Sequence, residues 1–356
     1  MTLTVATAAA RPMMPILLAL SAAHLLNDLI QSMIPALYPL LKDSYQLSFA
    51  QIGFITLAFQ VTSSLLQPAI GFIADRRPSS YAMAGGMAAT LSGLIGLAIA
   101  PSYAMVLVSA AMVGLGSAVF HPEATRMARH AAAGQQGLAQ GIFQIGGHVG
   151  YAVGPLLAAA LVVPRGQASL GWVSIVALAA MVLMTWTGMR YTEMRRAQAA
   201  AAGKARPDAT PAAAPLDRGS VLFAMTILIV LLFSKNAYAS AFTSFYTFYL
   251  IERFGVSVPF SQVMLFLYLV VGAIGVIIGI SILGALPFAL ILPFADLFWT
   301  GVLSVLISLI MASAFASILI YAMDLVPHRV GFVGGLFYGL AFGLGGIAAA
   351  GLGVIA

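Results

Sequence analysis

Residues 114–129 hold the side chains of this chain that are best suited to chemistry inside a membrane. An apolar run of small residues ends in His121 and Glu123, and Arg126 and Arg129 follow at intervals of three. Such ionisable groups are costly in lipid unless they are paired or hydrated. Imidazole and carboxylate groups can carry protons, whereas guanidinium groups can hold an anion. We predict that this stretch belongs to an ion or proton pathway; the alternative is a solvated pair at a helix end.

A second polar group lies within the first apolar run. His24, Asn27, Asp28 and Gln31 are spaced by three, four and seven residues, so all four share one face of a helix. Lipid would reject that face, and we therefore expect it to line a cavity or a helix contact. A structural hydrogen-bond cluster is one interpretation. The functional one is a proton site at Asp28 and His24, with Asn27 and Gln31 as substrate ligands.

Three further positions are candidates for binding. Gln144 and His148 are four residues apart on one face of another apolar run, which predicts a second polar stripe facing the first. Lys235 lies inside an apolar run and needs an anion, a carboxylate partner such as Asp28, or a water path. We expect Lys235, with Tyr246 nearby, to contact an anionic substrate; for His148 a proton role and a plain structural hydrogen bond remain equal alternatives.

The elements that position these groups must be membrane-spanning helices. The 356 residues are 62% hydrophobic and only 7% charged, with a mean hydropathy of +1.03, whereas soluble domains carry about 25% charged residues. We predict an all-α polytopic membrane protein. The absence of cysteine excludes disulfides and cysteine-ligated metal, and we predict no metal and no cofactor. Short basic loops do not suggest nucleic acid, and no nucleotide-binding loop or catalytic motif indicates an enzyme.

The apolar runs divide the chain into two halves. We predict an N-terminal six-helix bundle over residues 1–190, a cytoplasmic linker over 191–219 and an incomplete C-terminal bundle over 220–356, with about 11 spans in all. The run 260–295 contains no charged residue between its flanks. It is too long for one ordinary helix and has no polar hairpin for two, so a single and a double crossing both stay open.

Basic residues predict the orientation of the chain. Of the 16 Lys and Arg residues, only Lys42, Arg165 and Arg253 fall on one side of the predicted membrane, and Lys235 lies within a span. Because positive loops face the cytoplasm, we expect the N-terminus and the linker to be cytoplasmic. Asp75 and Arg76 lie in one such basic turn, where a role in holding one conformation is the prediction.

Several of these motifs together resemble the major facilitator superfamily, and more particularly its fosmidomycin-resistance branch. The resemblance covers almost the whole chain. Its loop motif lies between the second and third spans, and the motifs that carry the resemblance are Gly71 to Arg77, His24 to Asp28, Phe120 to Glu123 and Gln144 to His148.

The resemblance implies a bacterial inner-membrane antiporter that exchanges protons for a small drug such as fosmidomycin, a phosphonate. Asp28, Glu123, His24 and His148 are then the candidates for proton coupling, and Asp75, Arg76 and Arg126 those for gating. A positive group such as Lys235 suits an anionic phosphonate. The chain departs from the family in two places. The family repeats its loop motif between spans eight and nine, and it has one more span at its end; we find neither feature in this sequence. They motivate the alternative of a truncated, transport-inactive membrane protein.

Overall fold

The computed structural model describes residues 12–202, 217–275 and 285–355, and the elements found there are helices. The first part of the chain forms α1 (Met14–Ala36), α2 (Tyr38–Tyr45), α3 (Phe49–Gln60), α4 (Leu66–Arg76), α5 (Ala82–Ile99), α6 (Tyr103–Ala131), α7 (Gln136–Leu157) and α8 (Leu170–Ala202). The second part forms α9 (Arg218–Phe254), α10 (Val258–Gly275), α11 (Leu286–Ile291), α12 (Leu297–Leu325) and α13 (Val330–Ile355). Wider π-helical turns join α3 to α4 and extend α7.

Polar caps mark where several of these helices begin. Ser48 accepts a hydrogen bond from the Gln51 backbone and completes a capping box at α3. Ser102 caps α6, and Asp296 caps α12 by accepting from the Trp299 N–H at 2.8 Å. Asp217 caps α9, and its hydrogen bonds from the Ser220 side chain and backbone hold the pKa of Asp217 below its usual value. Each cap satisfies N–H groups that the first helical turn leaves without a partner.

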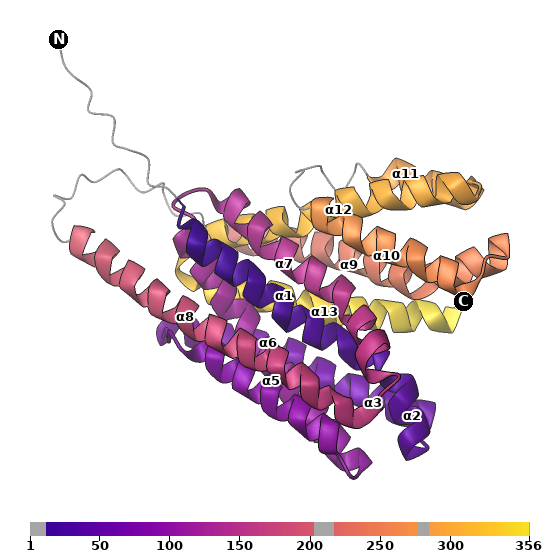
Figure 1. The fold of residues 1–356 in the computed structure, drawn as a ribbon. Coiled ribbons are helices and arrows are strands. Elements are labelled where there is room, and N and C mark those ends of the chain that lie inside the picture. The colour runs from indigo at the N-terminus through magenta and orange to yellow at the C-terminus, as the bar shows by residue number, and fades with distance from the viewer. Residues whose placement is uncertain (1–11, 203–216, 276–284, 356) are drawn as a thin grey trace.

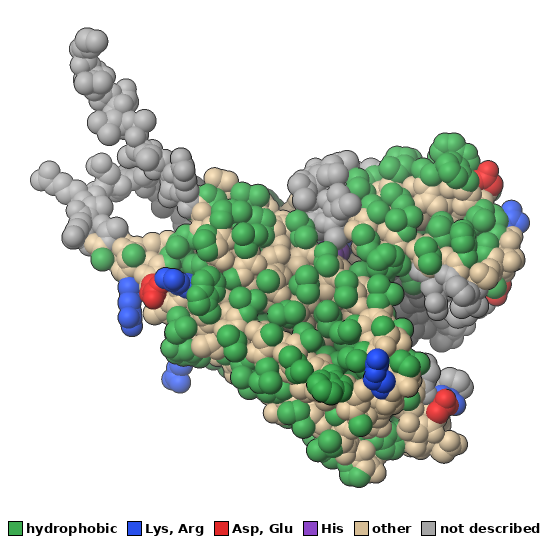
Figure 2. Space-filling model, in the orientation of Figure 1, with side chains coloured by type: hydrophobic (Ala, Val, Ile, Leu, Met, Phe, Trp, Pro, Cys, Tyr) green, Lys and Arg blue, Asp and Glu red, His purple; other side chains and the backbone are tan. Residues whose placement is uncertain are grey.

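The apolar surface of the helices accounts for the high hydrophobic content of the sequence. Within the described ranges, eight helical segments are long and apolar enough to cross a membrane. Figure 2 shows hydrophobic side chains over the flanks of the visible face and charged ones toward the helix ends. This is the distribution that a bilayer requires. The prediction of an all-α polytopic membrane protein is therefore confirmed for the fold class, while the number of spans stays a prediction.

Helix α13 lies between the two parts of the chain (Figure 1). It packs against α4 and α6 from the first part and against α9 from the second. Glycines permit its closest approach, because the Gly71 and Gly331 backbones of α4 and α13 lie so near that a side chain at either position would collide with the other helix. Side chains of α13 can therefore contact α4 and α6, which lie more than 200 residues earlier in the sequence.

The end of α8 and the uncharged run 260–295 are the two segments where the structure and the sequence-based expectation have to be compared. Helix α8 continues to Ala202, past the predicted end of the span at residue 190, because the added residues are rich in alanine, the strongest helix former. Residues 203–216 of the predicted linker lie outside the described residues. In the uncharged run, α10 begins and α11 ends toward the same end of the molecule (Figure 1). Residues 276–284 between them are not described, so the number of crossings stays a prediction.

Candidate functional site: a buried carboxylate between two histidines

Asp28 of α1 is the centre of a buried polar cluster. The Nε2 atom of His24, one turn earlier on the same helix, lies 3.2 Å from the Asp28 Oδ2 atom. From α6, the His121 Nε2 atom lies 3.6 Å from the Asp28 Oδ1 atom. Asn27 donates to the same Oδ1 at 2.9 Å and Gln31 donates at 3.4 Å. The exposed fractions of His24, Asp28 and His121 are 3%, 7% and 0%, so bulk water does not solvate this cluster.

The two imidazoles are held from behind by backbone carbonyls. His24 Nδ1 lies 2.8 Å from the carbonyl oxygen of Phe143, and His121 Nδ1 lies 3.1 Å from that of Ser117. A carbonyl oxygen only accepts, so each Nδ1 must carry the hydrogen in these bonds. The Nε2 atom of each ring is then left facing Asp28. In the neutral rings, each Nε2 lone pair faces one carboxylate oxygen. A proton placed in either contact converts that contact into a hydrogen bond, and the other contact needs a second proton.

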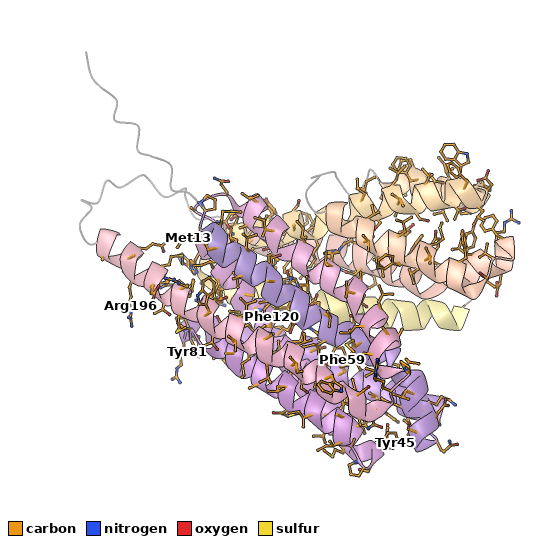
Figure 3. All side chains as sticks on the ribbon, in the orientation of Figure 1. Met13, Tyr45, Phe59, Tyr81, Phe120 and Arg196 are labelled. Atoms are coloured by element: carbon orange, nitrogen blue, oxygen red, sulfur yellow. The ribbon has the colours of Figure 1, made fainter. Side chains whose placement is uncertain are left out.

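Close packing of α7 against α1 fixes this geometry. Gly147 lies directly against the His24 ring, and Gly146 against the Ser21 backbone. The Phe143 ring stacks on the His24 ring, with centroids 4.2 Å apart and an interplanar angle of 21°. Phe120, beside both histidines, marks the level of the cluster along the bundle, between Met13 at one end and Tyr45 at the other (Figure 3). The site therefore lies well inside the bundle.

The second polar stripe meets a residue from the other part of the chain. Gln144 of α7 accepts a hydrogen bond of 2.5 Å from the Tyr338 hydroxyl of α13, which in turn accepts one of 3.3 Å from Gln140. His148 is bonded through Nδ1 to the Gln144 carbonyl of its own helix, at 2.9 Å. The sequence placed Gln144 and His148 on one face, but it contained no signal for Tyr338, a tyrosine in an otherwise apolar, glycine-rich helix.

Lys235 of α9 lies beside an aromatic ring. Its Nζ atom is 5.3 Å from the centroid of Phe315, a cation–π contact. Among the described residues Lys235 forms no ion pair, so the suggested pair with Asp28 is not found. Tyr246, further along α9, stacks on Phe242 with centroids 4.5 Å apart. Lys235 thus contacts an aromatic ring, and Tyr246 is packed among aromatic rings.

Glu123 and Arg126 form a separate buried pair on α6. Arg126 donates to the Glu123 Oε2 atom at 3.1 Å and 2.5 Å, and a third nitrogen donates to the Tyr191 hydroxyl of α8 at 3.1 Å. Tyr191 also bonds His130 at 2.8 Å. Both partners of the pair are almost fully buried. The structure therefore joins Glu123 to the α6–α8 contact and not to the Asp28 cluster.

Asp75 and Arg129 connect the two parts of the chain. The Asp75 carboxylate accepts 2.8 Å hydrogen bonds from the backbone N–H groups of Gly331 and Phe332, at the start of α13. Arg129 pairs with Asp324 of α12 at 2.5 Å. By contrast, the Arg76 guanidinium packs over the Phe72 ring of its own helix, 3.9 Å from the centroid. A carboxylate at a helix N-terminus is favoured by the helix dipole.

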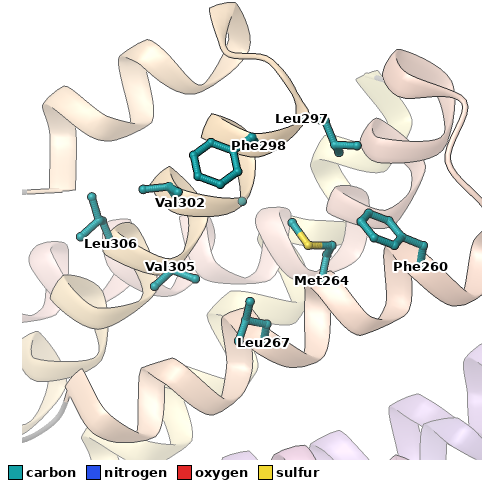
Figure 4. A pocket seen from close by; sticks show the side chains of 9 residues that line it. Phe260, Met264, Leu267, Leu297, Phe298, Val302, Val305 and Leu306 are labelled. Atoms are coloured by element: carbon teal, nitrogen blue, oxygen red, sulfur yellow. The ribbon is translucent and has the colours of Figure 1, made fainter.

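An apolar cavity elsewhere in the structure differs in kind from this site. It has a volume of about 660 Å³ and lies between α10 and α12, lined by Phe260, Met264, Phe298 and six other residues without a charged side chain (Figure 4). It offers no group that would hold a proton or an anion.

The donor atoms of His24, Asp28 and His121 lie within 4.8 Å of one another, a spacing that suits proton sharing and would also admit a metal ion.

The apolar helices define a multi-pass membrane protein, and the family match makes it a transporter. The Major Facilitator Superfamily matches residues 20–350, and the chain belongs to this family of transporters, which are not enzymes. The chain is 48% identical to the fosmidomycin resistance protein of Escherichia coli (strain K12), covering 98% of this chain and 88% of the relative. It is 39% identical to the uncharacterized MFS-type transporter YfnC of Bacillus subtilis (strain 168), covering 96% and 86%.

Solved structures agree on the fold. The transporter FucP in the outward conformation superposes with a TM-score of 0.68 at 16% identity, over 96% of this chain and 92% of that one. The human organic anion transporter MFSD10 gives 0.70 at 17% identity, over 96% and 93%. The family match and the relative at 48% identity confirm the resemblance to the major facilitator superfamily and its fosmidomycin-resistance branch.

Proposed function

We propose that this chain is a proton-coupled antiporter that exports a small anionic drug, of the phosphonate class of fosmidomycin, across the bacterial inner membrane. The relative at 48% identity is named for fosmidomycin resistance. The observation that carries the proton part is the meeting of Asp28 with His24 and His121, each imidazole turning Nε2 toward the carboxylate. Such a buried cluster changes its internal hydrogen bonding with each proton, which is the property a coupling site needs.

Lys235 supplies the binding group for the drug in this proposal. Its ammonium is half-buried and pairs with an aromatic ring, which leaves it free to form charge-assisted hydrogen bonds to a phosphonate. Asn27, Gln31 and Gln144 remain proposed polar ligands, and Tyr246 a proposed aromatic wall. His148 is a proposed secondary proton carrier.

Asp75 and Arg126 are the proposed gating residues, together with Arg76. The contacts Asp75–α13 and Arg129–Asp324 join the two parts of the chain at the end that carries the basic residues. We place this end in the cytoplasm because positive loops face inward. Alternating access then consists of breaking these contacts while the halves 1–190 and 220–356 rock about the buried site. In this scheme the described conformation is closed toward the cytoplasm.

Reconstituted proteoliposomes test the proposal directly. With an imposed pH gradient, fosmidomycin should accumulate against its own gradient, and addition of the drug should drive a measurable counterflow of protons. Asp28→Asn removes the proton-binding carboxylate while keeping its shape, so it should abolish proton-driven accumulation but retain drug exchange. Asp43→Asn, an exposed acid at the far end of the bundle, serves as the control and should behave as the wild type.

Two results would count against the scheme. Drug movement that ignores every imposed pH gradient would refute proton coupling, and unchanged coupling in Asp28→Asn would remove Asp28 from it. A transport-inactive protein is the second candidate, and complete absence of drug movement in the folded wild type would favour it. The family match over residues 20–350 and the assembled buried cluster argue against this candidate.

A further inference from the structure

Tyr338 of α13 lies between the proposed proton site and the proposed drug site. Its exposed fraction is 3%. On one side its ring lies 4.7 Å from the His121 ring and 6.4 Å from the His24 ring, measured between centroids. On the other side it meets Phe315 edge-on at 4.8 Å. Phe315 is also the ring beneath the Lys235 ammonium. A continuous series of ring contacts therefore leads from Asp28 to Lys235.

The hydroxyl of Tyr338 fixes where this ring lies. It donates to Gln144 at 2.5 Å and accepts from Gln140 at 3.3 Å, and both partners belong to α7. Helix α7 also carries the Phe143 carbonyl that orients His24. A buried tyrosine held at its tip has few alternative positions, because close-packed interiors move between discrete arrangements and do not deform smoothly. The ring is thus tied to the proton site through two separate routes.

We propose that Tyr338 is the positioning residue that couples proton occupancy of the His24–Asp28–His121 cluster to drug binding at Lys235. This inference rests on the proposed function. An anion that draws the Lys235 ammonium off the Phe315 ring removes one support of Tyr338, and the displaced ring no longer covers His121. The environment of the cluster then changes and it releases its proton. By linkage, proton binding must weaken drug binding to the same extent.

The titratable and charged groups near this series come from several helices. They are His24 and Asp28 of α1, His121 of α6, His148 of α7 and Lys235 of α9. Glu123 and Arg126 are paired with each other beside α8. A pH dependence alone therefore does not identify Tyr338. The informative measurement is how far that pH dependence changes when the Tyr338 hydroxyl is removed and all of these titratable groups are kept.

The test uses the full-length protein in detergent, with fosmidomycin as the ligand and calorimetry at several pH values. If one proton leaves per drug bound, the dissociation constant changes about tenfold per pH unit. Tyr338→Phe keeps the ring but loses the hydrogen bond to Gln144. In this variant the dissociation constant should change less than about threefold per pH unit. Tyr103→Phe, which removes a 2.9 Å hydroxyl bond to the Gln51 carbonyl between α6 and α3, should keep the wild-type dependence.

Each outcome separates the two proposals. A wild-type dependence retained in Tyr338→Phe overturns the role of Tyr338 and leaves the antiporter proposal standing. A wild type that binds no drug, or binds it equally at every pH, overturns the antiporter proposal and this inference with it. If Tyr338→Phe does not fold, Phe315→Leu decides, because it removes the next ring in the series; unchanged pH dependence in that variant also overturns the inference.

Discussion

The contact between Asp75 and the start of α13 gives a prediction whose size follows from the geometry. The carboxylate accepts two backbone hydrogen bonds of 2.8 Å, from Gly331 and Phe332. Hydrogen bonds to charged groups contribute about 1.5–3 kcal/mol each, and a negative charge at a helix N-terminus adds about 0.3–1 kcal/mol. Asp75→Asn retains one acceptor oxygen, so it loses one bond and the charge. Because Asp75 is partly exposed, we take the lower limit of about 1.5 kcal/mol.

A loss of that size changes the balance between closed and open conformations about tenfold toward the open one. The chain contains no cysteine, so a single introduced cysteine reports without background. Thr125→Cys places the thiol on a fully buried position of α6 against Gly334 of α13. Its rate of labelling by a water-soluble maleimide measures how often α6 and α13 separate. With Asp75→Asn, this rate should rise about tenfold.

The matched control is Asp43→Asn, which removes an equal charge from an exposed position. It should leave labelling of Thr125→Cys unchanged. A labelling rate within twofold of the parent in Asp75→Asn would show that the two hydrogen bonds do not hold the halves together, and the closure assigned to this contact would have to be abandoned.

Two more perturbations examine the drug site and the packing of α7. Lys235→Gln removes one charge-assisted interaction and should raise the fosmidomycin dissociation constant, measured by calorimetry, at least about tenfold. The control Lys42→Gln, at the far end of the bundle, should leave the constant unchanged. An equal effect of both substitutions would show that Lys235 does not bind the drug. Gly146→Ala drives a methyl group into the Ser21 backbone of α1 and should destabilise the protein by about 1–3 kcal/mol. Gly137→Ala, on the same helix with open space around it, should be neutral or slightly stabilising in the same thermal unfolding measurement.

The sequence predicted those parts of the site that lie on one helix. His24, Asn27, Asp28 and Gln31 were placed together because their spacing follows the helical repeat, and the structure brings the other three into contact with Asp28. The resemblance to the major facilitator superfamily also followed from short, local motifs. Periodicity is a property of a single element, so predictions made from it extend as far as that element.

Contacts between helices were beyond such reasoning. His121 was singled out as ionisable, yet its contact with Asp28 depends on how α6 packs against α1. Tyr338 and the start of α13 meet residues that lie 194 and 256 positions away in the sequence. Neither has a local signal, because a backbone N–H is present at every ordinary residue and one tyrosine in an apolar helix is common. Only the packed arrangement shows which of them matter.

The separation of Glu123 from Asp28 has a consequence for the mechanism. Both carboxylates are buried, and the sequence made both candidates for carrying protons. Asp28 meets two imidazoles, whose charge depends on pH, whereas Glu123 meets Arg126, whose charge does not. Arg126 donates two hydrogen bonds to the Glu123 carboxylate and one to the Tyr191 hydroxyl, so Glu123 is well suited to fixing the α6–α8 contact. We therefore propose that Asp28, between two imidazoles, is the better placed of the two carboxylates for proton exchange.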